Sequence, residues 1–325
     1  MVPSSCEDSF LMQLKHPVVC VVGPTASGKT DVAQELALQL GGEVVSADSM
    51  QIYRGMDIGT GKILPQERKV VHHGIDIVNP GEAYSASLFQ DYARKLFRDI
   101  DERDSWSVLA GGTGFYVRAA IDDYHFAQGG QTENPVREKY EGFLEENGRD
   151  ALWNILNEKD HESATLIHPH NAKRVIRALE MLELEGKSYA RQLEGFASMK
   201  QFLPARFFGL KVDPALLNLR IEQRVDAMME AGLVNEVKGL LEAGFEGACT
   251  AKEAIGYKEI VAALQGECSL EDAVCAIKQA TRRYAKRQRT WWRHDARIHW
   301  LDADDGDVSR LTQEILDSLK MDGLI

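Results

Sequence analysis

The stretch that most constrains this chain is Gly23-Pro-Thr-Ala-Ser-Gly-Lys-Thr30. It follows the apolar run 18–22 and precedes apolar residues spaced three and four apart over 32–40, a pattern typical of a strand, a glycine loop and a helix. The sequence of this segment matches the complete G-x-x-x-x-G-K-[ST] motif, and the flanking patterns are those that this motif requires. We therefore expect a loop whose backbone N–H groups and following helix N-terminus hold a phosphate chain.

Each residue type in this loop has a physical role. Gly23 and Gly28 permit a tight turn, Lys29 supplies a positive charge to the phosphates, and Thr30 supplies a hydroxyl ligand for Mg²⁺. The alternative, a glycine turn without a ligand, is disfavoured by the surrounding strand and helix patterns. The candidate phosphate-binding residues are Gly23, Pro24, Thr25, Ala26, Ser27, Gly28, Lys29 and Thr30.

Two further segments place polar residues directly after an apolar strand pattern. Asp48 follows the pattern at 43–47, and the glycine-rich segment 111–116, which contains Thr113, follows the pattern at 107–110. Because ligands bind beyond the carboxyl ends of parallel strands, we expect both residues at the sheet edge that carries the phosphate loop. An Asp48 that only caps the next turn is the alternative. A P-loop ATPase would more often show an acid after 107–110, and none is present.

The order of patterns predicts an α/β fold with a P-loop nucleoside-triphosphatase-like core, a parallel sheet and a helical insertion domain. The composition shifts near 122, where a linker-like run at 128–135 precedes helical patterns at 136–147, 149–158 and 171–182. A strand pattern returns at 206–212, and an apolar stripe over 217–241 predicts one long helix. We therefore expect a core of 1–121 and 203–325 and an insertion of 122–202.

Charge is unevenly distributed along the chain. The formal net charge is −12, yet 278–297 holds eight Lys or Arg and a single acid, Asp295. The cations recur at steps of three and four, which places them along one helix and predicts a local anion-binding surface. Arg220 and Arg224 lie one helical turn apart, so both could face one anion.

Several classes of protein are excluded or disfavoured. Hydrophobic residues make up 44% and charged residues 27%, as in ordinary globular proteins. The sequence has neither an apolar run long enough for a membrane span nor a secretory leader, so we expect a cytoplasmic protein. The five cysteines form no C-x-x-C pair, which favours free thiols over structural zinc. The adjacent pair His72-His73 favours a loop without metal.

With these motifs in hand, the chain resembles the tRNA dimethylallyltransferase family in its bacterial form. The segments that carry the resemblance run in the family's order and span most of the chain: GPTASGKT (23–30), DSMQIYRGMDIGTGK (48–62), HHGIDI (72–77), GGTGFY (111–116), HPHNAKRVIRALE (168–180), RIEQR (220–224), AIGYKE (254–259) and TRRYAKRQRTWWR (281–293).

The resemblance implies transfer of a prenyl group from dimethylallyl diphosphate to N6 of the adenosine 3′ of the anticodon, with Mg²⁺ as cofactor and a monomer as the expected state. It implies that Asp48 is the general base, Thr113 its neighbour and Arg224 the diphosphate clamp. It implies contacts of the tRNA anticodon stem-loop with Asp48, Ser49, Met50, Gln51, Thr113, Arg137, Lys173, Arg174, Arg177, Gly256, Tyr257, Lys258, Lys286, Arg287, Arg289 and Arg293.

Three other functions use the same loop. A prenyltransferase acting on free adenine nucleotides would share the loop and Asp48, but it needs neither the insertion nor the basic helix. A small-molecule kinase and a noncatalytic nucleotide switch are the others, and Asp48 beside a second glycine loop speaks against both.

Overall fold

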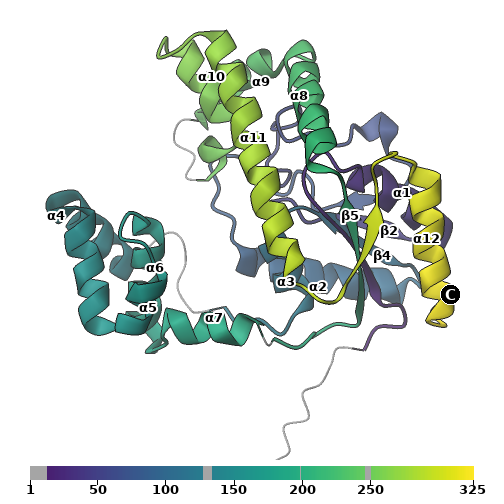
Figure 1. The fold of residues 1–325 in the computed structure, drawn as a ribbon, viewed down its shortest axis with the longest axis horizontal. Coiled ribbons are helices and arrows are strands. Elements are labelled where there is room, and N and C mark those ends of the chain that lie inside the picture. The colour runs from purple at the N-terminus through teal and green to yellow at the C-terminus, as the bar shows by residue number, and fades with distance from the viewer. Residues whose placement is uncertain (1–12, 127–133, 198, 246–249) are drawn as a thin grey trace, which may run out of the picture. The chain divides into compact units, whose positions relative to one another are not determined.

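The computed structural model describes residues 13–126, 134–197, 199–245 and 250–325 (Figure 1). The chain divides into two compact units, a core unit of Met1–Ile121 with Gln201–Ile325 and a helical unit of Asp122–Lys200. Most of the linker-like run 128–135 and of the N-terminal segment 1–16 lies outside the described residues.

The core unit is built on a six-stranded sheet in the order β3-β2-β4-β1-β5-β6, and every pair is parallel. The strands are β1 (Val18–Val22), β2 (Glu43–Ser46), β3 (His72–His73), β4 (Ser107–Gly111), β5 (Ala205–Lys211) and β6 (Ile298–Asp302). Val22 pairs with Gly111, and Ser46 pairs with Ala110. The carboxyl ends of β1, β2 and β4 therefore meet at one edge, which confirms the expected parallel sheet.

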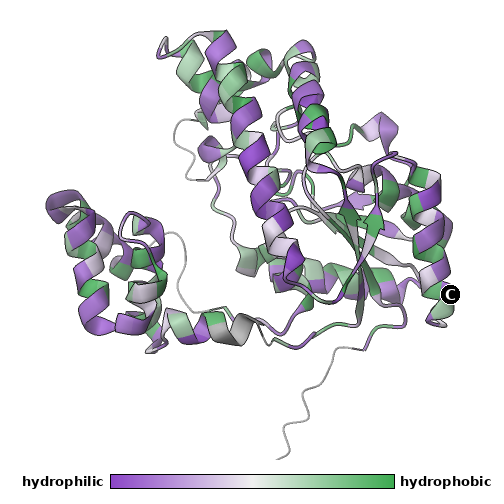
Figure 2. Ribbon diagram, in the orientation of Figure 1, coloured by the Kyte–Doolittle hydropathy of each residue, from purple (hydrophilic) through white to green (hydrophobic). Residues whose placement is uncertain are grey.

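Alternation along β1 explains why both faces of the sheet are covered. Val18, Cys20 and Val22 belong to one apolar core, whereas Val19 and Val21 belong to another, because successive strand side chains point to opposite faces. The first core is shared with α2 (Ala86–Glu102) and α3 (Gly114–Ile121), and the second with α1 (Lys29–Leu40) and α12 (Val308–Met321). Figure 2 shows the central strands as mostly hydrophobic and the outer helices as mixed.

The C-terminal half of the core unit adds the helices α8 (Pro214–Glu230), α9 (Leu233–Glu242), α10 (Tyr257–Leu264) and α11 (Leu270–Arg293), with short 3₁₀ turns η1 (Pro65–Glu67) and η3 (Ala251–Glu253) elsewhere in the unit. The single long helix expected over 217–241 is wrong. Gly232, with φ of 98°, takes the left-handed conformation that ends the helical hydrogen-bond ladder, so α9 begins in a new direction.

The helical unit contains α4 (Pro135–Lys159), α5 (His161–Leu166), α6 (Ala172–Glu185) and α7 (Tyr189–Ala197). Gly148, at φ 81° and ψ 175°, kinks α4 between the two helical patterns expected from the sequence. Asn171 caps α6 by accepting a hydrogen bond from the Arg174 amide. Tyr140 packs with buried aliphatic residues of α4 and α6 in a core that belongs to this unit alone.

The pair His72-His73 was expected in a loop and instead forms the edge strand β3, which pairs with Val44 and Val45 of β2. The ring Nε2 of His73 lies 2.6 Å from Oε2 of Glu43. Among the residues that the structure describes, no three His, Cys, Asp or Glu side chains are grouped as metal ligands. Within the same residues, no helix has the length and hydropathy needed to cross a membrane.

Candidate active site

A cavity of about 390 Å³ opens at the carboxyl edge of the sheet. Its walls include the phosphate loop from Thr25 to Thr30, Asp48 after β2, Gly111-Gly112 at the end of β4, and Arg224 from α8. Parallel strands deliver these segments to one place although they lie far apart in the sequence. The cavity therefore joins the candidate phosphate site to the candidate base.

Two glycines give the phosphate loop its path. Gly23 and Gly28 have φ values of 151° and 86°, in a region that side chains with a Cβ rarely adopt. A Cβ at Gly23 would also lie 3.0 Å from the carbonyl oxygen of Leu210, because the loop lies against β5. Thr30 follows in the first turn of α1 with an exposed side chain, so its hydroxyl is available to a ligand in the cavity.

Lys29 is a cation whose pKa is lowered well below its usual value in the cavity. Burial and the neighbouring Arg224 guanidinium lower the pKa of Lys29 to about 7, against the attraction of the Asp48 carboxylate. Its Nζ donates a hydrogen bond to the carbonyl oxygen of Pro24. A bound phosphate chain would favour the charged form, so ligand binding is expected to restore the proton.

Asp48 and Thr113 lie in neighbouring turns that are tied together. Oδ1 of Asp48 accepts a hydrogen bond from the Met50 amide at 2.9 Å, so Asp48 caps its own turn and also lines the cavity. Oγ1 of Thr113 accepts a hydrogen bond from the Ser49 amide at 3.1 Å and donates to Oγ of Ser49 at 3.4 Å. Asp48 can therefore cap its turn and take part in the site at the same time.

Arg224 of α8 lines the cavity, and its guanidinium contacts the glycine-rich segment 54–62. Its NH2 group donates to the carbonyl oxygen of Thr60 at 3.4 Å, and a Cβ on Gly61 would lie 1.8 Å from that group. Burial lowers the pKa of Arg224, although Asp48 opposes this. The expectation that Arg220 shares an anion with Arg224 is wrong, because Arg220 donates to the carbonyl oxygens of Ala303 and Asp304.

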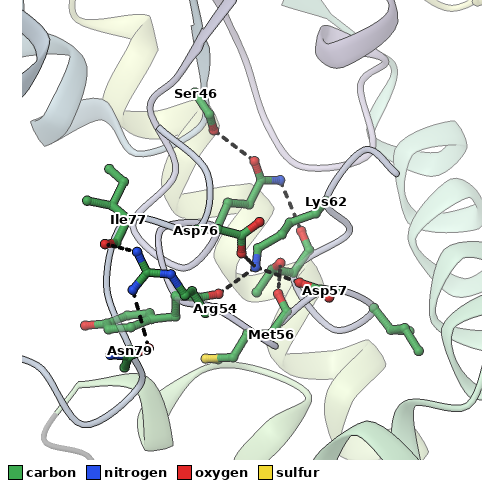
Figure 3. A network of polar contacts seen from close by, with 12 residues as sticks. Ser46, Arg54, Met56, Asp57, Lys62, Asp76, Ile77 and Asn79 are labelled. Atoms are coloured by element: carbon green, nitrogen blue, oxygen red, sulfur yellow. Dashed lines mark hydrogen bonds and ion pairs between the residues drawn. The ribbon is translucent and has the colours of Figure 1, made fainter. Parts of the chain in front are cut away.

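Lys62 stabilises the segment 54–62 from inside (Figure 3). Its Nζ donates to Oδ1 of Asp57 at 2.7 Å, to Oδ1 of Asp76 at 2.6 Å and to the carbonyl oxygen of Tyr53 at 2.5 Å. Gln51, expected to contact RNA, accepts a hydrogen bond from Oγ of Ser46 and contacts the carbonyl oxygens of residues 60 and 61. Sequence reasoning missed Lys62, because a lysine in a glycine-rich segment usually lies in solvent.

Glu236 of α9 binds the same segment, and sequence reasoning missed this residue as well. Its carboxylate accepts hydrogen bonds from the amides of Asp57 (2.9 Å), Ile58 (2.7 Å) and Gly59 (3.1 Å), and from the Tyr257 hydroxyl at 2.6 Å. Tyr257, expected at the RNA surface, has a fully buried side chain. Gly256 before it is also buried, whereas Lys258 after it is exposed.

The basic helix α11 divides into a neutralised and an unneutralised part. Nζ of Lys278 lies 2.6 Å from Oδ1 of Asp226, and NH1 of Arg282 lies 2.6 Å from Oε1 of Glu222, so α8 balances the first two cations. Four cations nearer the C-terminus are ion-paired with no acid among the residues that the structure describes, and we call them the α11 cations: Lys286, Arg287, Arg289 and Arg293. Arg289 is half-buried and the other three are exposed.

In the helical unit, the predicted RNA-contacting cations have two kinds of environment. Arg137 and Arg177 both bind the carboxylate of Glu180, which is fully buried, with Arg137 NH2 and Arg177 NH1 at 3.2 Å and 3.0 Å from Oε2. Lys173 and Arg174 are exposed at the start of α6. Arg137 and Arg177 therefore neutralise a buried acid, whereas Lys173 and Arg174 are exposed to solvent.

Comparison with known proteins gives consistent matches. The model of the IPP transferase family matches residues 51–295, and that of the isopentenyl transferase family matches 16–73. A tRNA dimethylallyltransferase of Carboxydothermus hydrogenoformans is 43% identical over 93% of this chain and 97% of its own, and one of Streptomyces coelicolor is 42% identical over 92% and 96%.

Solved structures agree with these matches. The crystal structure of a tRNA isopentenylpyrophosphate transferase from Bacillus halodurans is 40% identical, with a TM-score of 0.68, and the match covers 94% of this chain and 97% of that one. A eukaryotic dimethylallyltransferase described as acting on tRNA is 29% identical, with a TM-score of 0.80, over 95% of this chain and 79% of that one.

Proposed function

The chain belongs to the IPP transferase family, and we propose that it transfers the dimethylallyl group of dimethylallyl diphosphate to N6 of the adenosine 3′ of the anticodon in tRNA. The observation that carries this proposal is that the phosphate loop, Asp48 and Arg224 line one and the same cavity. It offers a place for a diphosphate on one side and for a nucleophile next to a carboxylate on the other.

In the proposed reaction, N6 of adenine forms a bond to C1 of the dimethylallyl group, and the bond between C1 and the diphosphate oxygen breaks. The electron pair of that bond leaves with the diphosphate, and the proton lost from N6 passes to the Asp48 carboxylate. An exocyclic adenine amine is a weak nucleophile because its lone pair is delocalised into the ring. A positioned base typically contributes about 10² to 10⁴ in rate for such a proton transfer.

The departing diphosphate needs preorganised positive charge. Lys29, Arg224 and the amides of the phosphate loop supply it from fixed positions around the cavity. Thr30 suits Mg²⁺, because an exposed hydroxyl at the cavity can complete the coordination of an ion held mainly by diphosphate oxygens and water. Bound there, Mg²⁺ would neutralise charge on the diphosphate.

We propose that the anticodon stem-loop binds through the α11 cations and through Lys173 and Arg174 of the helical unit, whose exposed side chains support this role. The target base must leave its stack, which is easier in a loop than in a duplex. We also propose that the protein is cytoplasmic. We propose that it acts as a monomer, since one chain supplies every protein group that the proposed reaction uses.

The test is incubation with dimethylallyl diphosphate and either unmodified tRNA or AMP, followed by mass analysis of the nucleosides. We expect dimethylallyladenosine from tRNA, at the position 3′ of the anticodon, without ATP consumption. Product from AMP and none from tRNA would refute the proposal in favour of a free-nucleotide prenyltransferase.

A further inference from the structure

One buried amide on α11 links the two loops of the cavity. Gln288 is only 5% exposed, although it lies between the half-buried Arg289 and the exposed Arg287. Its Oε1 accepts a hydrogen bond from the Thr25 amide at 2.8 Å, and its Nε2 donates to the carbonyl oxygen of Gly112 at 3.0 Å. Thr25 belongs to the phosphate loop and Gly112 to the loop after β4.

The chemistry of this bridge requires an amide. A backbone N–H can only donate and a carbonyl oxygen can only accept, so the bridging group must offer one acceptor and one donor at the same spacing. A glutamate of the same length offers acceptors alone while it is ionised, and an aliphatic side chain offers neither. The two backbone partners also determine which end of the Gln288 amide is oxygen.

The glycines of the loop after β4 are explained by the same packing. A Cβ at Gly112 would lie 2.1 Å from Nε2 of Gln288, and a Cβ at Gly114 would lie 2.0 Å from Nε1 of Trp291. These glycines therefore leave room for side chains of α11. One turn before Gln288, Tyr284 lines the same cavity.

We propose that Gln288 is a positioning residue that sets the distance between the phosphate loop and the loop carrying Thr113. The proposal rests on the proposed function, in which the first loop holds the leaving group and the second lies beside the nucleophile. It also assigns the Thr25 amide to Gln288, so the phosphate cradle is made by the remaining amides of the loop. The buried face of α11 thus positions the reacting groups, while its exposed face carries the α11 cations.

The experiment compares Gln288→Glu and Gln288→Leu with the unmodified protein in steady-state dimethylallyl transfer to tRNA. We expect kcat to fall about tenfold to a hundredfold in both variants near pH 8, because small displacements of reacting groups have effects of this size. The KM for tRNA should change little, because the α11 cations are untouched.

The glutamate variant has a further readout that a loss of stability would not give. A protonated carboxylic acid again offers one donor and one acceptor. Burial and Asp48 raise the pKa of a carboxyl at this position, whereas Lys29 and Arg224 of the same cavity oppose the shift. The ratio of kcat for Gln288→Glu to kcat for the unmodified protein should therefore rise as the pH falls from 8 to about 5.5, whereas the ratio for Gln288→Leu should stay flat.

Gln313→Glu serves as the matched control, since Gln313 is an exposed residue of α12 that does not line the cavity. Its kcat should equal that of the unmodified protein at each pH. Unchanged kcat in both Gln288 variants, or a Gln288→Glu ratio that does not vary with pH, would overturn the proposal. If the unmodified protein itself does not prenylate tRNA, the proposed function fails instead, so the two failures are distinguishable.

Discussion

Replacing Glu236 with alanine is expected to leave four hydrogen-bond donors without their acceptor. Three are the backbone amides at 57–59, and the fourth is the Tyr257 hydroxyl. Burial and the Glu236 carboxylate raise the pKa of Tyr257 above its usual range, so the hydroxyl remains a donor at any practical pH. The ring of Tyr257 also lies directly over Gly59, where a Cβ would approach it to 2.5 Å.

The magnitude follows from the burial of these donors. An unsatisfied buried donor costs about 1 to 3 kcal/mol. Water can reach the partly buried amides, so each contributes about 1 kcal/mol, whereas the fully buried hydroxyl contributes about 2 kcal/mol. We expect Glu236→Ala to lower the free energy of unfolding of the core unit by about 5 kcal/mol, and Tyr257→Phe by about 1.5 kcal/mol.

The assay is urea unfolding followed by tryptophan fluorescence. Four of the five tryptophans lie in the core unit and only Trp153 lies in the helical unit, so a Trp153→Phe background reports the core unit alone. This separation matters because a chain of two units need not unfold in a single two-state transition. Glu242→Ala, at the exposed end of the same helix, is the control and should change the unfolding free energy by less than about 0.5 kcal/mol.

The double variant tests the reasoning most directly. Because both substitutions remove the same hydrogen bond, the combined loss should fall short of the sum of the single losses by about 1.5 kcal/mol. Strictly additive losses, or a loss below about 1 kcal/mol for Glu236→Ala, would show that the carboxylate does not hold this segment.

Three further predictions concern ligands. The affinity for dimethylallyl diphosphate should fall as the pH rises above 7, because the pKa of Lys29 is about 7 in the free protein and a bound anion raises it. Calorimetry in buffers of different ionisation enthalpy should show proton uptake that Lys29→Arg abolishes, and equal uptake in both proteins would contradict this. Asp48→Asn should lower kcat by about 10² to 10⁴ while tRNA binding persists, and an unchanged kcat would remove Asp48 as the base. Arg289→Ala should reduce the salt slope of tRNA binding by about 0.7 to 0.9, whereas Arg282→Ala should leave it unchanged because Glu222 already neutralises Arg282. Equal slopes for both variants would refute the assignment of the α11 cations.

The sequence by itself determined the elements whose signal is local. The phosphate loop between 18–22 and 32–40 follows from a motif in its required context, and the expected parallel sheet follows from apolar runs of strand length. Asp48 and Thr113 could be assigned to one sheet edge because each directly follows such a run. Helical patterns also predicted α4, α6 and α11, but no pattern predicted α3, α5, α7 or α10, and Gly232 breaks the expected helix of 217–241.

Tertiary structure alone decided which polar side chains hold the cavity together. Gln288 lies 263 positions from Thr25, and Glu236 lies 179 positions from Asp57, so no periodicity or motif could pair them. Burial follows from long-range packing, and only burial turns Gln288 from one polar residue of a basic helix into a bridge between two loops. Acids of α8 likewise decide which cations of α11 are already ion-paired and which can bind an anion.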